Sequence, residues 1–508
     1  MFVGSETENY LRYLQSAGIV RPYPWSVRSF SPAELDRLVP TDSAHPWSGA
    51  RLLASDTTPG RLRVGLVAPR AAATFNSSFP YGSNDGPVWA GKGLTSAVEA
   101  GFWARFGPLS LVVAPLLFRA ENGGFDLYDN GRTGPLSYGD PQFPHEVDLP
   151  QRFGDGAYTR LDPGQSTLRV DLPFVAAGVS TANQQWGPAS EHPVILGNNA
   201  GGFLHAFLGT PAPVNLWIGR AHGRVVWGRL SQSGYTDVGA DTASRLMTGV
   251  VATFTPRGVP GLEVGAARFY HSPWPEGGIS GGDLLKPFEG ILKEDVDATG
   301  MGPDGSTDVD NQLFSVFMRW VFAPAGLEVY GEFGREDHNW DFRDLVLEPD
   351  QQSAYTAGFR KLWLRPESRA LGLRGEVMNS QVSHLIQARP QGPFYRHTMM
   401  RQGHTNRGQI LGSPAGLGGA GAMLAADYFH PDGRWTVSWS RELRLEDLLR
   451  PEGRPRESDV LNGLGVEALV FRLGLEITTG VRGVYEINRN FGSDAFNLNA
   501  TMQVRVRR

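Results

Sequence analysis

The feature that most constrains the fold of this chain is a strict two-residue alternation of apolar and polar side chains near its C-terminal end. From residue 496 to residue 507 every even position is apolar and every odd position is polar, beginning with Phe496 and Asn497. Shorter runs of the same pattern occur at 313–322, 327–333 and 434–440. Successive side chains of a β-strand point to opposite faces, so each segment has one apolar and one polar face. Such strands fit between lipid and an aqueous lumen, although a half-buried strand of a soluble sandwich alternates in the same way.

The connections between these segments separate the two possibilities. Every second connection is short, as at Gly107-Pro108 and Thr210–Pro213, whereas most of the others are long, as at 120–164 and 382–416. Alternating short turns and long loops are typical of an up-and-down outer-membrane barrel, with the turns in the periplasm and the loops outside. We expect strands at 61–69, 95–106, 109–119, 165–172, 174–181, 203–209, 214–231, 244–255, 261–271, 311–322, 327–337, 351–364, 368–381, 417–430, 433–445, 461–473, 475–487 and 494–506.

The sequence therefore predicts an all-β fold, a transmembrane antiparallel up-and-down β-barrel of about 18 strands. Composition agrees with this prediction: the 508 residues include 64 glycines and 11% aromatic residues, which suit crowded turns and the two membrane interfaces. No run of about 18 apolar residues offers a transmembrane helix. The absence of cysteine excludes disulfides and zinc–thiolate sites. A net charge of −5 without a basic tract indicates no nucleic-acid partner.

The first 60 residues have a helical pattern instead. Apolar side chains recur with helical spacing between Glu6 and Ala17, and Ser31 with Glu34 forms a capping box that opens a short helix to Val39. We expect 1–60 to be an N-terminal periplasmic helical segment, as a plug or at the periplasmic face, and 61–508 to be the barrel with long extracellular loops. The chain opens without a basic and apolar leader, so we expect a bacterial outer-membrane protein whose signal peptide is absent from this numbering.

Several segments resemble one protein family. The segment 183–188, which reads Asn-Gln-Gln-Trp-Gly-Pro, and the segment 196–200, which reads Leu-Gly-Asn-Asn-Ala, are similar to the central signature of the Wzi-type outer-membrane capsule assembly proteins. Further segments similar to this family lie, in the same order, at 10–25, 80–93, 152–166, 268–288, 332–345 and 403–412. The positions that carry the resemblance most directly are Trp186, Gly187, Pro188, Asn198, Asn199, Gly403, Thr405, Arg407 and Gly408.

The resemblance implies a lectin-like, non-catalytic barrel that binds and retains capsular or extracellular polysaccharide at the cell surface. Its expected partners are surface polysaccharide, outer-membrane lipid and lipopolysaccharide, and we expect a monomer. Aromatic side chains in long loops are candidates for contact with sugar rings, whose apolar C–H faces stack on them. These candidates, which could equally serve as interface girdle or loop core, are Tyr128, Tyr138, Phe143, Trp186, Trp274, Trp340 and Tyr395.

One acidic loop is a candidate site for a divalent cation. Asp295, Asp297, Asp304 and Asp308 could supply oxygen ligands to calcium, although the twelfth position of the EF-hand-like stretch is Ser306 instead of a bidentate glutamate. A solvated acidic loop is the simpler interpretation. We therefore expect no cofactor other than, at most, a divalent cation.

Two glycine-rich motifs do not indicate an enzyme. Residues 416–421 match G-x-G-x-x-G, but no strand–turn–helix unit surrounds them, and 278–282 match G-x-S-x-G within a long loop. The first hypothesis is thus a barrel whose outer loops bind acidic surface polysaccharide. The alternative is a porin-like channel for sugars or small anions, because a barrel of this size can enclose an aqueous lumen. Charges on the inner faces suit either hypothesis, as an ion-pair lattice or as a selective lining.

Overall fold

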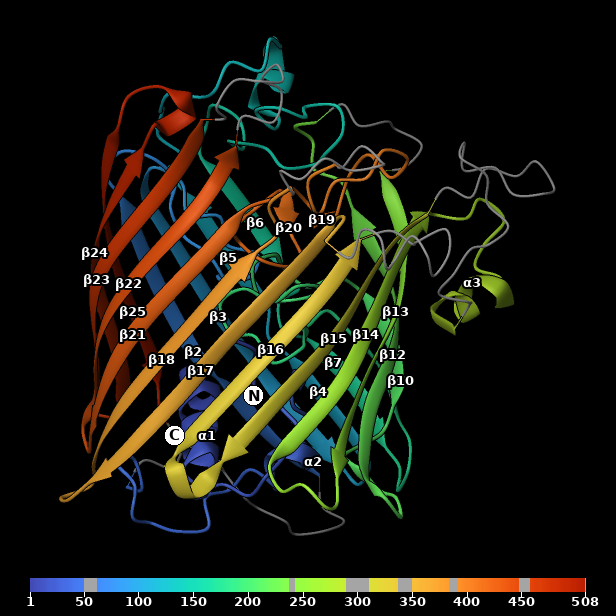
Figure 1. Cartoon of the computed structure of the whole chain (residues 1–508), viewed down its shortest axis with the longest axis vertical. Helices are drawn as coiled ribbons and strands as arrows, with labels where there is room; N and C mark the ends of the chain where they lie inside the picture. Colours follow the sequence, from blue (N-terminus) through green and yellow to red (C-terminus); the bar gives the residue numbers. More distant parts are fainter. Residues whose placement is uncertain are drawn as a thin grey trace.

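The computed structural model describes residues 1–49, 62–236, 243–288, 310–336, 350–382, 392–446 and 457–507. Within these residues, eighteen antiparallel strands form one closed barrel with strongly tilted strands (Figure 1). Fifteen of them are continuous: β2 (Arg63–Asn76), β3 (Gly93–Phe106), β8 (Ala176–Ser180), β12 (Gly219–Ser231), β13 (Ser244–Pro256), β14 (Leu262–Pro273), β15 (Asn311–Phe322), β16 (Leu327–Glu336), β17 (Ser353–Arg365), β18 (Arg369–Asn379), β21 (Ala420–His430), β22 (Gly433–Glu446), β23 (Ser458–Arg472), β24 (Leu475–Ile487) and β25 (Ala495–Val506).

The other three strands are each interrupted once. They are β4 (Leu109–Val113) with β5 (Leu116–Ala120), β6 (Tyr158–Asp162) with β7 (Thr167–Asp171), and β10 (His205–Gly209) with β11 (Val214–Asn215). The barrel closes where β25 pairs with β2, from Arg70 opposite Arg505 to Asn76 opposite Asn499. Closure satisfies the backbone groups of the first and last strands and leaves no sheet edge at this seam.

The alternation in the last strand has the predicted consequence. Phe496, Leu498 and Met502 are exposed on the outer wall, whereas Asn497 and Asn499 are buried in the lumen. Strands β21 to β24 expose Leu424, Trp435, Val437, Trp439, Leu464, Val466 and Val481 in the same way. An apolar outer wall around a polar interior is the pattern of a barrel that faces lipid, and it confirms the predicted fold class. Among the described helices, none is long and apolar enough to span a membrane.

The long connections gather at one end of the barrel, which we call the loop rim, and the short turns gather at the opposite end, the turn rim (Figure 1). The turn predicted at Thr210–Pro213 is wrong. Thr210 instead donates its backbone N–H to Gly223 and bonds through its hydroxyl to His222, so the strand stays paired with β12 past two prolines. The chain reverses at 216–218, where Leu216 and Gly219 exchange backbone hydrogen bonds. The first strand also extends to Asn76, beyond the predicted end at residue 69.

The N-terminal segment lies inside the lumen near the turn rim (Figure 1). Helix α1 (Glu6–Ser16) begins at Ser5, and α2 (Pro32–Leu35) begins at the capping box of Ser31 and Glu34 but ends before the predicted Val39. The Arg12 and Tyr13 side chains of α1 bond to Glu328 at 2.8 Å and to Asp427 at 2.7 Å, respectively, on the barrel wall. The side chains of Tyr10, Leu11, Tyr13, Trp25, Trp47, Phe429 and their neighbours form an apolar cluster there.

The upper part of the lumen is filled by connections that fold inward from the loop rim. In the connection 181–204, β9 (Gln185–Trp186) pairs with β1 (Val27–Arg28) of the N-terminal segment. In the connection 380–419, of which the structure describes 380–382 and 392–419, β19 (Thr405–Asn406) pairs with β20 (Gln409–Ile410). Their apolar side chains join those of β12 to β15 in a second cluster around Trp186, Ile195, Phe269 and Tyr395. The remaining described helices are peripheral: α3 (Gly281–Leu285), and the 3-10 turns Gly134–Tyr138, Lys286–Phe288, Ala323–Ala325 and Arg489–Phe491.

Candidate functional site

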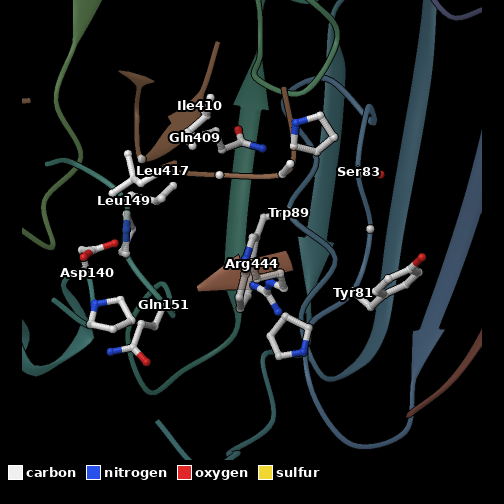
Figure 2. Close-up of a pocket in the computed structure, with 18 of the residues that line it drawn as sticks. Tyr81, Ser83, Trp89, Asp140, Leu149, Gln151, Gln409, Ile410, Leu417 and Arg444 are labelled. Atoms are coloured by element: carbon white, nitrogen blue, oxygen red, sulfur yellow. The ribbon is translucent and has the colours of Figure 1, made fainter. Parts of the chain in front are cut away.

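A cavity of about 250 Å³ opens at the loop rim, and we call it the outer pocket. It lies between the connection 77–92, the connection 121–157 and the inward-folding connection 380–419, above the ends of β22, β23 and β24. Figure 2 shows Asp140 and Gln151 on one side, Tyr81 on the opposite side, and Trp89 and Arg444 between them. Concave sites with apolar walls and a few converging polar groups are the usual form of small-ligand sites.

Aromatic side chains supply much of the apolar wall. Tyr81, Trp89, Phe125 and Phe143 line the outer pocket, and all four are half-buried. The Trp89 ring meets the ring of Phe153 edge-on at 5.2 Å, and the Arg396 guanidinium lies over Phe143 at 4.4 Å. These contacts hold the rings in place while leaving part of each surface accessible. Rings held in this way can stack on the C–H face of a sugar at little entropic cost.

The polar wall is built from side chains that also tie the loops together. The Asp140 carboxylate accepts backbone N–H groups from Gln142 at 3.0 Å and Phe143 at 2.8 Å. Gln151 bonds to the backbone of Tyr128 through both its amide oxygen and its amide nitrogen. Burial raises the pKa of Asp140 to about 6, despite the two backbone donors. The Asp140 carboxylate therefore changes its charge near neutral pH.

The floor of the outer pocket carries two neighbouring carboxylates, Asp459 on β23 and Glu486 on β24. Glu486 forms ion pairs with Arg489 and, at 3.6 Å, with Arg444. Asp459 accepts the backbone N–H of Asn490 at 3.0 Å through Oδ2. The floor thus presents acceptors and already-paired guanidinium groups to any ligand that enters.

The asparagines of the family-like segments fix the loops behind the pocket. Asn198 donates to the Asn84 carbonyl at 2.5 Å and accepts from Asn183 at 2.9 Å, which joins the connection 181–204 to the connection 77–92. Asn199 donates to the Ile410 carbonyl at 3.0 Å and lines the outer pocket itself. These two residues therefore position three loops relative to one another.

The remaining family-like positions also hold the loops together. The Pro188 carbonyl accepts the Arg12 guanidinium at 2.6 Å, and Thr405 donates to the Gln402 carbonyl at 2.8 Å. Arg407 forms an ion pair with Asp162 at 3.4 Å, and its backbone N–H donates to Ser231. The three glycines Gly187, Gly403 and Gly408 all have positive φ. At Gly187 a Cβ atom would also collide with the Glu332 carboxylate, so two independent reasons demand glycine there.

The structure places the aromatic candidates in different environments. Phe143 lines the outer pocket, whereas Tyr128 and Tyr138 are half-buried in the same connection without lining it. Trp274 is half-buried beside Arg229, away from the pocket. Trp186 and Tyr395 are completely buried, with the Trp186 indole donating to Gln184 and the Tyr395 hydroxyl donating to the Val194 carbonyl. A ring without exposed surface cannot stack on a sugar, and both rings act as packing. Trp340 lies outside the described residues.

The proposed cation ligands Asp295, Asp297, Asp304 and Asp308 also lie outside the described residues. Within the part of the chain that the structure describes, no group of three or more potential ligands is placed to hold a metal ion. Sequence reasoning missed Tyr81 and Trp89 as candidates for sugar contact. Both belong to the glycine-rich segment 80–93 that resembles the family. Two aromatic residues in a segment of tight turns are the sequence feature that could have identified them.

Comparison with known proteins gives one family and one fold. The family model described as capsule assembly protein Wzi matches residues 128–453. A solved structure of Wzi from Escherichia coli, described as a carbohydrate-binding β-barrel of the outer membrane involved in group 1 capsule assembly, has a TM-score of 0.64 and 14% sequence identity. The match covers 100% of this chain and 99% of that one.

Other solved structures are similar with lower TM-scores. OccK2 of Pseudomonas aeruginosa has a TM-score of 0.41 at 9% identity, with 87% of this chain and 96% of that chain covered. A BenF-like porin from Pseudomonas fluorescens has a TM-score of 0.41 at 9% identity, with 88% of this chain and 99% of that chain covered. Among curated proteins there is no significant match.

Proposed function

The chain belongs to the Wzi family of capsule assembly proteins, and we propose that it is a bacterial outer-membrane barrel that binds polysaccharide through its loop rim and retains it at the cell surface. In this proposal the loop rim faces outward and the turn rim faces the periplasm, as the lengths of the connections indicate. The protein acts as a lectin-like attachment site and leaves the polymer chemically unchanged.

The observation that carries this proposal is the composition of the outer pocket. It combines half-buried rings, Tyr81 and Trp89 foremost, with amides and carboxylates at the rim where the long loops meet. Rings that stack on C–H faces, together with polar groups that bond hydroxyls, are what a sugar site needs. The carbohydrate-binding description of the similar Escherichia coli barrel supports the same assignment.

The first test uses cells that make the polymer. Deleting the gene should move polymer from the cell-bound fraction into the medium without lowering total synthesis, and the wild-type gene should restore attachment. The double variant Tyr81→Ala with Trp89→Ala should restore attachment poorly, because each lost stacking contact weakens binding by about 1 kcal/mol. Trp217→Ala is the control, since Trp217 is an exposed aromatic residue at the chain reversal 216–218, on the rim opposite the outer pocket.

Heat-modifiable migration of each variant in gels would verify that the barrels are folded. Equal amounts of cell-bound polymer with and without the gene would contradict the attachment function. If the double variant and the Trp217→Ala control restore attachment equally well, the polysaccharide binds at a site other than the outer pocket. A separate experiment tests whether the protein leaves the polymer chemically unchanged. The purified protein is incubated with polymer, and we expect the chain length of the polymer to stay constant over time.

A further inference from the structure

The floor of the outer pocket has an unusual imbalance between carboxylates and their hydrogen-bond donors. Asp459 is 3% exposed and Glu486 is 1% exposed, and the two side chains interact directly. Two ionised carboxylates at such short range repel each other unless cations or donors lie between them. The partners of each oxygen atom therefore indicate what a ligand can supply.

Glu486 uses the available cations. Arg489 binds one of its oxygens, and Arg444 lies 3.6 Å from the other. Asp459 receives one backbone N–H, from Asn490, on Oδ2. Its other oxygen, Oδ1, is buried and accepts no hydrogen bond from the described residues, and the contact between Asp459 and Glu486 becomes a hydrogen bond only when the two carboxyls share a proton. A buried carboxylate oxygen without a donor is costly, on the order of 1–3 kcal/mol, and a ligand that brings a donor removes this cost.

The formal charge of the outer pocket also disfavours an anionic ligand. Its lining includes five carboxylates and two arginines, which gives a formal charge of −3. Both arginines already interact with Glu486, so the positive charge of each is partly compensated before a ligand enters, although the Arg444 side chain remains 45% exposed. The carboxylates of the lining are Asp85, Asp140, Glu446, Asp459 and Glu486. A uronate, sulfate or phosphate group placed here would meet net repulsion in a partly desolvated site.

We propose that the outer pocket selects a sugar residue that carries hydrogen-bond donors and no negative charge, and that it binds a free amino sugar most tightly, through Asp459. This inference rests on the proposed function and adds the class of sugar to it. It refines the expectation that the outer loops bind acidic surface polysaccharide by naming the kind of sugar residue that enters the pocket. In an acidic polymer, the outer pocket would hold the neutral or amino sugar of the repeat unit, with the acidic residues outside it.

The test compares three oligosaccharides of equal length on the purified full-length protein in detergent at pH 7. The probes are a glucosamine tetramer, a glucose tetramer and a galacturonate tetramer, measured by isothermal titration calorimetry at low salt. We expect the glucosamine tetramer to bind at least tenfold more tightly than the glucose tetramer, and the galacturonate tetramer to bind more weakly than either. Added salt should narrow the difference, because it screens the charges.

The variant Asp459→Asn assigns the preference to one side chain. It should reduce the glucosamine-to-glucose ratio to about threefold or less. Asp432→Asn, at an exposed turn on the opposite rim, should leave the ratio unchanged. If Asp459→Asn fails to fold, the affinities of the three probes for the wild-type protein still show whether the outer pocket prefers amino and neutral sugars to an anionic sugar.

Each outcome separates this inference from the proposed function. Galacturonate binding as tight as glucose binding would overturn the charge preference while leaving polysaccharide binding intact. The absence of binding by all three probes, with polymer still shed by the Tyr81→Ala and Trp89→Ala double variant, would overturn the sugar class only. The absence of binding together with normal polymer attachment in the double variant would overturn both.

Discussion

Buried arginines and glutamates hold the N-terminal segment against the barrel wall residue by residue. Glu328 is completely buried, and its two carboxylate oxygens each lie 2.6 Å from a guanidinium Nη2 atom, one of Arg12 in α1 and the other of Arg319 on the neighbouring strand. A buried pair of this kind adds little net stability over apolar packing, but removing one partner leaves an uncompensated charge. Such contacts therefore determine the position of α1 more than they add to the stability of the barrel. Together they form an ion-pair lattice on the inner wall.

At the same scale, His404 makes the inward-folding loops sensitive to acid. It is fully buried, its Nε2–H donates to the Ile195 carbonyl at 2.6 Å, and its ring stacks on Tyr395. Burial, together with the nearby Arg245, lowers the pKa of His404 from 6.5 to about 4, although the hydrogen bond to Ile195 opposes the shift. The folded protein thus binds this proton more weakly than the unfolded chain does.

A base with a lowered pKa contributes stability above its unfolded value that is lost as the pH falls. For His404 the loss should begin near pH 6.5 and be complete near pH 4, and it amounts to about 3 kcal/mol at most. We expect the melting temperature in detergent to fall between pH 7 and pH 5, and His404→Gln to flatten that dependence. His430→Gln, at the turn rim, is the control. The same slope in wild type and His404→Gln would assign the acid sensitivity to other groups.

At the scale of elements, the strands follow from the local pattern and the inward-folding connections do not. Alternation and short turns identify nearly every strand of the wall, because each strand needs an apolar face toward lipid and a polar face toward the lumen within its own sequence. The burial of Trp186 and Tyr395 could not be predicted in this way, since Trp186 packs on Phe269 and Tyr395 bonds to Val194, and both partners are distant in sequence. The outer pocket could not be predicted from local pattern either, because its lining comes from three connections and three strand ends that are far apart in the sequence.

The connection 181–204 offers a direct test of how tightly an inward-folding element is docked. Gly187 has φ +83°, and its N–H donates to the Ser26 carbonyl at 3.0 Å, beside the Glu332 carboxylate. Gly187→Ala should therefore incur backbone strain of about 1 kcal/mol and also displace a buried side chain. We expect faster hydrogen exchange at the Trp186 amide, which is bonded to Leu196 in the native loop.

Gly278→Ala is the matched control for this variant. Gly278 has φ +87°, and no atom lies within 4 Å of the position that an alanine methyl group would take, so the substitution there tests backbone strain alone. If hydrogen exchange at the Trp186 amide is faster in Gly187→Ala, and Gly278→Ala changes exchange only near residue 278, then close contact with the barrel wall fixes the connection 181–204. Unchanged exchange at Trp186 would mean that the connection tolerates a shift and is held mainly by Asn198 and its neighbours.

At the scale of the whole molecule, the filled lumen distinguishes this barrel from an open channel. An apolar cluster around α1 occupies the turn rim, and a second cluster around Trp186 occupies the upper lumen. Two internal spaces, of about 340 and 360 Å³, lie along one side of the wall beside β22 to β25 and β2. The segment 81–85 lines both the outer pocket and the space beneath it, and so lies between them.

This arrangement predicts a barrel that is nearly silent in planar bilayers. An empty barrel of this many strands would conduct ions, because its interior is wide enough for an aqueous channel. With both clusters in place we expect the wild-type protein to show no stable conducting steps, and removal of residues 1–48 to produce them by emptying the turn rim. The truncated barrel should favour cations, since carboxylates outnumber arginines beside both internal spaces. Stable steps in the wild-type protein, selective for anions or reduced by sugars, would instead establish the porin-like channel for sugars or small anions and make attachment secondary.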